Sequence, residues 1–353
     1  MTAGTASSAG KSGRWRTIAS ILLRVALLAI AILLLRRELN GVGLDGLLAS
    51  IRRYHASRVL LALGLTAASF ITLGVFEFLA LRYVGKRAVR IIPRRTALAT
   101  SFVAHAYSQS VGLAILTGTA VRFRSYSRYG LDALDIARLS VLVTATVTLG
   151  LLTTGGVAFL MTPGRITLMG TSLSLVPLGI LLLIPIVCYL AWGAFGSEDF
   201  HGRGRWRIRR PILSVALQQI GISSLDWALA GTVFFVLVSR SLQISYGELL
   251  TIYLVAQTAA VLSHVPGGVG VFEAVVMGLF AVHADERIAA PAIAASVAAS
   301  LLVYRIVYYL VPLFAAIALS TVAEVIRSRA KRRELHPSAA PAAASSPMAT
   351  DAI

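Results

Sequence analysis

The stretch HVPGGVGVFE, His264 to Glu273, decides the fold of this chain. It lies inside a long apolar segment that is otherwise typical of a membrane helix. Pro266 lacks an amide donor and each helical glycine costs about 1 kcal/mol, so this stretch cannot continue an unbroken helix. In hydrocarbon, a broken backbone is tolerated only where protein or water surrounds it. An interruption of this kind therefore points to a transport site.

The composition is that of a membrane protein. Hydrophobic residues make up 57% of the chain and charged residues 14%, with a mean hydropathy of +0.79. Soluble domains carry roughly 25% charged residues, and several apolar stretches here reach the roughly 20 residues that span a bilayer. The net charge is +18, but the basic residues fall in short loops between apolar spans. This is the positive-inside pattern, so we expect a multi-pass cell-membrane protein and no nucleic-acid partner.

The chain divides into three parts. Residues 1–13 are rich in Ala, Ser and Gly and are predicted to be disordered. Residues 14–326 form the predicted membrane domain, and 327–353 form a basic and then Pro/Ala/Ser-rich tail that we expect in the cytoplasm. Unbroken spans are predicted near 17–35, 57–84, 134–161, 175–195, 212–238 and 289–322, with broken segments at 96–121 and 249–282.

The basic loops predict how the broken segments run. If the N-terminus, the loops at 86–95, 122–128 and 203–210 and the tail are all cytoplasmic, each broken segment must return to the face from which it enters. The two hairpins then enter from opposite faces with three crossings between them, as in inverted repeats. We therefore predict an all-α, polytopic helical bundle with two broken or re-entrant segments and an inverted repeat. A plain eight-span bundle is the alternative, and it would place the loop at 122–128 outside.

Three stretches resemble one membrane family. They are GLAILTGTAVRFRSYSRYGL (residues 112–131), HVPGGVGVFEAVV (264–276) and YRIVYYLVPL (304–313). Together they resemble the lysylphosphatidylglycerol synthase transmembrane-region family, which includes the flippase half of multiple peptide resistance factors. Thr119 and Phe123 depart from the pattern, where glycine and tyrosine are expected. In bifunctional members a soluble aminoacyltransferase domain follows; this chain ends soon after its last span, so the resemblance implies the lipid-moving part alone and no enzyme.

Charged residues at membrane depth are the first candidates for function. Arg305 lies near the middle of the last apolar stretch, where it would hold an anionic head group or form a structural ion pair. Asp226 lies mid-span with Gln218 and Gln219 nearby, and an Asp226–Arg305 pair would neutralise both charges. No nucleophile–base pair, phosphate loop or metal-ligand spacing is present, so we expect no cofactor and no metal.

The broken segments supply the other candidates. Glu273 falls in the first turn of a half-helix if that helix opens at Val271, where it would cap the helix or act in transport. His264 would titrate during transport or pack as a structural histidine. In and after the first break, the candidates for binding the head group are Gln109, Arg122 and Arg124. The two arginines would bind a lipid phosphate by charge-assisted hydrogen bonds or mark a cytoplasmic loop.

These features predict a lipid translocase of the bacterial inner membrane. Two hairpins would meet near the midplane and present half-helix N-termini to a phosphate, with Gly267, Gly268 and Gly270 allowing close approach of the backbone. The partner would be a phospholipid or another lipid-linked anionic head group, which crosses through a polar cavity. A membrane-embedded lipid-modifying transferase and a non-transporting scaffold for envelope synthesis are the alternatives. The sequence leaves open which lipid moves, its direction, the energy source and a homo-oligomeric state; His264, Glu273 and Asp226 are the candidate proton carriers.

Overall fold

The computed structural model describes residues 54–111, 114–162, 165–168, 171–196, 211–238, 244–282 and 290–335. The predicted first span, the predicted disordered N-terminus, the basic loop at 203–210 and the end of the tail lie outside these residues.

Long apolar helices dominate the described part of the chain, which confirms the predicted all-α membrane fold. Five helices there are long and apolar enough to cross a membrane. They are α3 (Ala56–Val84), α7 (Ala133–Met161), α8 (Leu175–Phe195), α9 (Leu213–Leu237) and a last rod made of α12 (Ala290–Tyr304), η4 (Arg305–Leu310) and α13 (Val311–Leu335). The described β-structure is one antiparallel hairpin between α7 and α8, formed by β1 (Arg165–Leu168) and β2 (Thr171–Ser174).

Local signals in the sequence set where the helices begin. Asp132 precedes α7, and its side chain accepts a hydrogen bond of 2.7 Å from the Asp135 amide. Ser245 and Glu248 form a capping box at the start of the helix that follows α9. Such caps satisfy amides that have no partner within the helix. The two caps therefore fix where these two helices begin.

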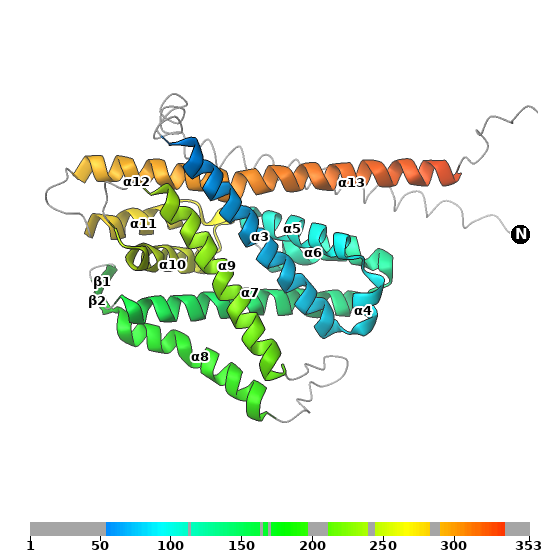
Figure 1. Cartoon of the computed structure of the whole chain (residues 1–353), viewed down its shortest axis with the longest axis horizontal. Coiled ribbons are helices and arrows are strands. Elements are labelled where there is room, and N and C mark those ends of the chain that lie inside the picture. The colour runs from blue at the N-terminus through cyan, green and yellow to red at the C-terminus, as the bar shows by residue number, and fades with distance from the viewer. Residues whose placement is uncertain are drawn as a thin grey trace, which may run out of the picture.

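The first broken segment folds as a helical hairpin. After α3 comes the short helix α4 (Lys86–Ile91), then α5 (Arg94–Val111) and α6 (Ala114–Tyr126) pack against each other, and η1 (Ser127–Tyr129) leads into α7. Figure 1 shows α5 and α6 side by side at the end of the molecule that holds α4 and the last part of α13. We call this the basic end. The hairpin enters and leaves there.

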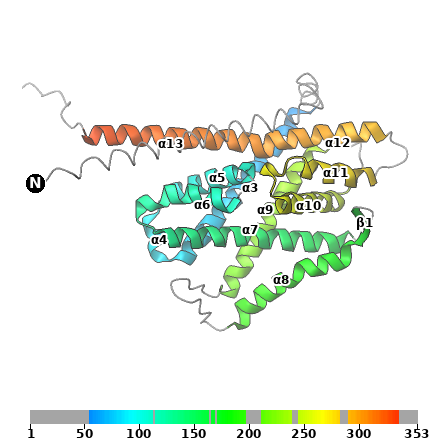
Figure 2. The same ribbon diagram turned by 180° about the vertical axis from the view of Figure 1, so that it is seen from behind.

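The second broken segment folds as a hairpin that enters from the other end. It consists of α10 (Tyr246–Ser263), η3 (Pro266–Gly268) and α11 (Val271–Val282), with α10 and α11 in contact. Both views place α10 and α11 at the end that holds the β-hairpin and the start of α12 (Figures 1 and 2). A hydrogen bond of 2.7 Å between Thr162 and Thr251 joins the end of α7 to α10.

The hairpin tips meet inside the bundle, where α5 contacts η3 and η4. The order of long helix, hairpin and long helix occurs twice: α3, α5–α6 and α7, and then α9, α10–α11 and the last rod. Because the hairpins enter from opposite ends, the second set runs in the opposite direction. This is the predicted inverted repeat, with α8 as the crossing that separates its halves.

Small residues let the long helices approach closely, as is usual in membrane bundles. A Cβ added to Gly150 of α7 would lie 2.5 Å from Cβ of Ser223 on α9. A Cβ added to Gly179 of α8 would lie 2.9 Å from the carbonyl oxygen of Gly156 on α7. Two buried apolar clusters result, one around the first hairpin and one around the second. Each hairpin is therefore held by its own core.

Candidate functional site

The turn of the second hairpin is built on left-handed backbone. Gly267, Gly268 and Gly270 have φ values of 63°, 62° and 83°, and His264 has a φ of 54°. Glycine adopts this region readily because it has no Cβ. A Cβ on Gly268 would in addition lie 2.6 Å from Cβ of Ala260. The turn thus folds tightly back onto α10, as the sequence predicts.

Arg305 holds this turn in place. Its Nη1 donates to the carbonyl oxygen of Gly267 at 2.5 Å, and its Nη2 reaches that of Gly268 at 3.4 Å. Its Nε donates to Oε1 of Glu273 at 2.7 Å, and Nη2 lies 2.6 Å from the same oxygen. The side chain of Arg305 is only 7% exposed and that of Glu273 only 15%. Arg305 is therefore a structural strut between the last span and the turn.

Aromatic rings enclose the guanidinium. Its central carbon lies 5.3 Å from the ring centre of Phe272 and 4.6 Å from that of Tyr309, within the range of cation–π attraction. Arg305 begins a π-helical turn, residues 305–310. Pro312 follows that turn, and a proline inside a helix removes one backbone hydrogen bond and clashes with the preceding turn. The structure shows the local adjustment before Pro312 as a π-helix, a feature frequent at functional sites.

Glu273 caps α11 as well as binding Arg305. The amide of Gly270 donates to Oε2 of Glu273 at 2.7 Å, and α11 begins at Val271 as predicted. A protein carboxylate therefore occupies the helix start that was expected to receive a lipid phosphate. His264 ends α10, is exposed, and lies 2.9 Å through Nδ1 from the carbonyl oxygen of Leu262.

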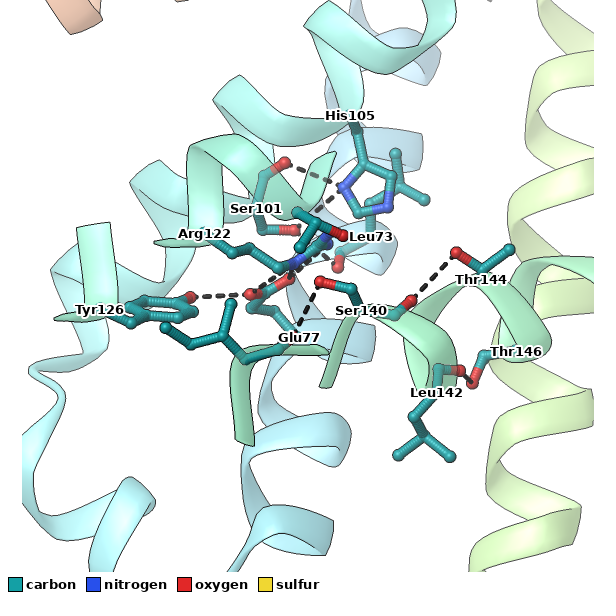
Figure 3. A network of polar contacts seen from close by, with 12 residues as sticks. Leu73, Glu77, Ser101, His105, Arg122, Tyr126, Ser140, Leu142, Thr144 and Thr146 are labelled. Carbon is teal, nitrogen blue, oxygen red and sulfur yellow. Dashed lines mark hydrogen bonds and ion pairs between the residues drawn. The ribbon is translucent and has the colours of Figure 1, made fainter. Parts of the chain in front are cut away.

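The first hairpin carries a second buried ion pair. Arg122 of α6 donates through Nε and Nη2 to both carboxylate oxygens of Glu77 on α3, at 2.8 to 3.1 Å. Tyr126 donates to the same carboxylate at 2.7 Å. The residues Glu77, Arg122 and Tyr126 are 0%, 4% and 0% exposed. Figure 3 shows Arg122 and Tyr126 converging on Glu77, with His105 and Ser101 beside them. Arg122 is thus a buried helical residue and not part of a cytoplasmic loop.

One edge of the Arg122 guanidinium faces the inside of the hairpin. Within the described residues, which omit the connection at 112–113, Nη1 makes no hydrogen bond. A Cβ added to Gly118 would lie 2.9 Å from this nitrogen and 3.1 Å from Oγ of Ser108. The imidazole of His105 lies on the same side and contacts the carbonyl oxygen of Ser101 at 2.9 Å through Nδ1. Nη1 and Ser108 Oγ therefore converge where Gly118 leaves room.

Two further candidates lie near this hairpin. Oε1 of Gln109 is buried without a hydrogen-bond partner in the described part of the chain, close to the end of α5. Arg124 donates through Nη2 to Glu324 at 2.5 Å, which ties α6 to α13 on a more exposed surface. Among the described residues Gln109 Oε1 thus accepts no hydrogen bond, whereas Arg124 connects two helices.

The predicted pair between Asp226 and Arg305 is wrong. Asp226 accepts hydrogen bonds from Ser69 and Thr72 of α3, and Arg305 binds Glu273 instead. Hydropathy gives the depth of a residue along its helix but not the direction in which the side chain points. Glu77 is the important site residue that is missing from the predicted set. The sequence feature that could have identified Glu77 is an acidic residue inside an apolar span, followed by a broken segment that carries an arginine.

The sequence comparisons show the family of the chain. Residues 21–327 match the model of the family described as lysylphosphatidylglycerol synthase TM region. The chain belongs to this family. It is 32% identical to the uncharacterized protein slr0712 of Synechocystis sp. over 90% of this chain and 95% of that protein. It is 29% identical to the inner membrane protein YbhN of Escherichia coli, over 86% and 92% of the two chains.

A larger relative shares only the membrane part. The phosphatidylglycerol lysyltransferase of Staphylococcus aureus is 25% identical over 86% of this chain, but the match covers 34% of that protein. The apolar helices and the inner membrane relative together support a multi-pass cell-membrane protein.

Proposed function

We propose that this protein moves phospholipid head groups across the membrane without changing them chemically. The observation that carries the proposal is the meeting of two hairpin tips inside the bundle, each hairpin entering from a different end. Backbone that is not helical is tolerated at this depth only when it is buried in protein or lines a polar path. Inverted repeats with broken segments are a common architecture of transporters.

The first hairpin is the better anion site of the two. In the second hairpin each nitrogen of Arg305 already donates to Glu273 or to the turn. In the first, Arg122 uses Nε and Nη2 on Glu77 and directs Nη1 toward Gly118 and Ser108. A guanidinium edge binds phosphate oxygen by charge-assisted hydrogen bonds. The unused acceptor of Gln109 suits a hydroxyl or ammonium donor of the head group.

Phosphatidylglycerol is the first lipid to test. A relative that shares the membrane region carries the name phosphatidylglycerol lysyltransferase. The positive-inside rule supports placing the basic end, with α4 and the end of α13, in the cytoplasm. The acyl chains would stay in lipid while the head group passes the hairpin tips.

Purified protein in liposomes tests the proposal. Fluorescent phosphatidylglycerol in the inner leaflet is protected from a membrane-impermeant reductant, and its loss over time measures transbilayer movement. The decisive variant is Gly118→Ala, because its methyl group would occupy the space beside Nη1 of Arg122 and Oγ of Ser108. Alanine favours the helix over glycine by about 1 kcal/mol, so the fold should survive. The matched control is Gly64→Ala in α3, where an added Cβ meets nothing within 4 Å.

We expect Gly118→Ala to slow lipid movement about tenfold or more, since a charge-assisted hydrogen bond contributes roughly 1.5–3 kcal/mol. The Gly64→Ala control should move lipid at the wild-type rate. A wild-type protein that moves no lipid would refute the proposal and favour a scaffold. A change in the mass of the lipid during the assay would instead identify a membrane-embedded transferase.

A further inference from the structure

Asp226 differs from the two other acids inside the bundle, Glu77 and Glu273. It lies in the middle of α9 and is 6% exposed. Glu77 and Glu273 each face an arginine, but Asp226 forms no ion pair with any Lys, Arg or His of the described residues. Its neighbours are the hydroxyl groups of Ser69 and Thr72. A charge in this position lacks a counter-charge.

The hydrogen bonds fit a neutral carboxylic acid. Ser69 Oγ donates to Oδ1 of Asp226 at 2.5 Å, and Thr72 Oγ1 donates to the same oxygen at 2.9 Å. Oδ2 accepts no hydrogen bond from the described residues, so it is the oxygen that can carry a proton. A bare carboxylate at the centre of a membrane helix costs about 2.5–3.5 kcal/mol on insertion scales. Protonation removes that cost and keeps both hydrogen bonds.

The groups that face Asp226 do not offer a competing charge. From η4 it faces the phenol of Tyr308, and from α10 that of Tyr253. From α3 it receives the two hydroxyl groups, and no ionisable group of α7, α8 or α12 within the described residues forms a hydrogen bond or an ion pair with it. Asp226 is thus a buried acid that has hydroxyl partners and no counter-charge among the described residues.

A chain of contacts joins Asp226 to the turn of the second hairpin. Ser69 Oγ, which donates to Asp226, also lies 3.0 Å from the hydroxyl of Tyr308. Tyr308 belongs to the π-helical turn η4 that begins at Arg305, and Arg305 donates to the carbonyl oxygen of Gly267 in the turn. A change at Asp226 therefore reaches the turn through one short, irregular helical element.

We propose that Asp226 is a proton-binding site in the membrane interior and that its protonation state controls the turn of the second hairpin. Deprotonation breaks the Oδ2–H bond, leaves the electron pair on the carboxylate and passes the proton to water. The anion is a stronger acceptor than the neutral acid, so it draws the Ser69 hydroxyl closer, and with it the Tyr308 hydroxyl that donates to Ser69 Oγ, which shifts η4 and the turn. The inference deepens the proposed function, on which its biological role rests, by assigning the group that couples lipid movement to a proton gradient.

The proton site can be tested without any lipid movement. Infrared difference spectra of the protein in lipid, recorded between acid and alkaline pH, should contain the C=O band of a protonated buried carboxylic acid. That band should disappear in Asp226→Asn, in which the amide oxygen keeps both hydrogen bonds. The matched control is Glu248→Gln, an exposed acid whose replacement preserves the capping box. A wild-type spectrum without the band, or a band that persists in Asp226→Asn, overturns the proton-binding site.

The link to the turn has its own readout. A spin label at Leu262, which is 71% exposed on the last turn of α10, reports on the turn in a Cys188→Ser background. We expect its mobility to change with pH at the midpoint of the infrared band and to be independent of pH in Asp226→Asn. A pH-independent label in the wild-type protein overturns the control of the turn. Because neither measurement uses transport, failure of the proposed function in liposomes is distinguished from failure of this inference.

Discussion

The strut formed by Arg305 makes a quantitative prediction. Replacing Arg305 by Met removes the partner of the largely buried Glu273 carboxylate, which is 15% exposed, and the donor to the carbonyl oxygens of Gly267 and Gly268. Breaking a buried ion pair by removing one partner costs about 3–5 kcal/mol. Glu273→Gln should cost less, about 2–3 kcal/mol, because Arg305 keeps the carbonyl oxygens and two aromatic rings.

The double variant decides whether the pair acts as a unit. If the two side chains stabilise the turn through each other, the changes are not additive, and we expect a coupling energy of about 2–3 kcal/mol. Thus Glu273→Gln/Arg305→Met should lose little more free energy of unfolding than Arg305→Met alone. Equilibrium unfolding in mixed detergent micelles, followed by circular dichroism, measures all four proteins. Additivity to within about 0.5 kcal/mol would refute the strut. So would a fully stable Arg305→Met that moves no lipid, since this result would assign Arg305 to the head group.

Three other predictions follow from the described contacts. Gly268→Ala should lower stability by about 2–4 kcal/mol in the same unfolding assay, because of its left-handed φ and its contact with α10, whereas Gly278→Ala should be neutral or stabilising. Tyr126→Phe should lower stability by about 1.5–3 kcal/mol, since it removes a donor to a buried carboxylate. Ser127→Cys, in a Cys188→Ser background, should react with an impermeant maleimide only from the cytoplasmic side; labelling of intact cells would contradict the proposed orientation.

Much of the fold is predictable because it depends on one-dimensional signals. The positions of the helices follow from apolar runs, and the second break follows from proline and glycine at residues 266–270. The hairpins follow from charge parity, because consecutive basic loops cannot be separated by a single crossing. These signals fix the depth and direction of each segment. The α3 bounds, Ala56–Val84, lie within a residue of the predicted span.

The ion pairs are not predictable in this way. Asp226 and Arg305 lie at similar depth, which made them a plausible pair, but pairing also requires that the two side chains point at each other. That rotation is set by helix contacts such as the close approach of Gly150 to Ser223. Arg122 shows a different limit. Several arginines close together in a sequence are typical of a cytoplasmic loop, and only the fold shows that α6 buries the Arg122 side chain against Glu77.

The two pairs assign different tasks to the two hairpins. In each, the returning arm carries one member of a buried ion pair and a long helix carries the other: Arg122 with Glu77, and Glu273 with Arg305. In the second hairpin the pair also fixes the turn, and every guanidinium nitrogen is engaged. In the first hairpin one guanidinium edge remains directed inward, beside a glycine that cannot gain a side chain without filling that space. Our proposal therefore assigns the binding of an anionic head group to the first hairpin. The second hairpin, joined through η4 to Asp226, which forms no ion pair with any of the described residues, is the one to which our proposal assigns the movement.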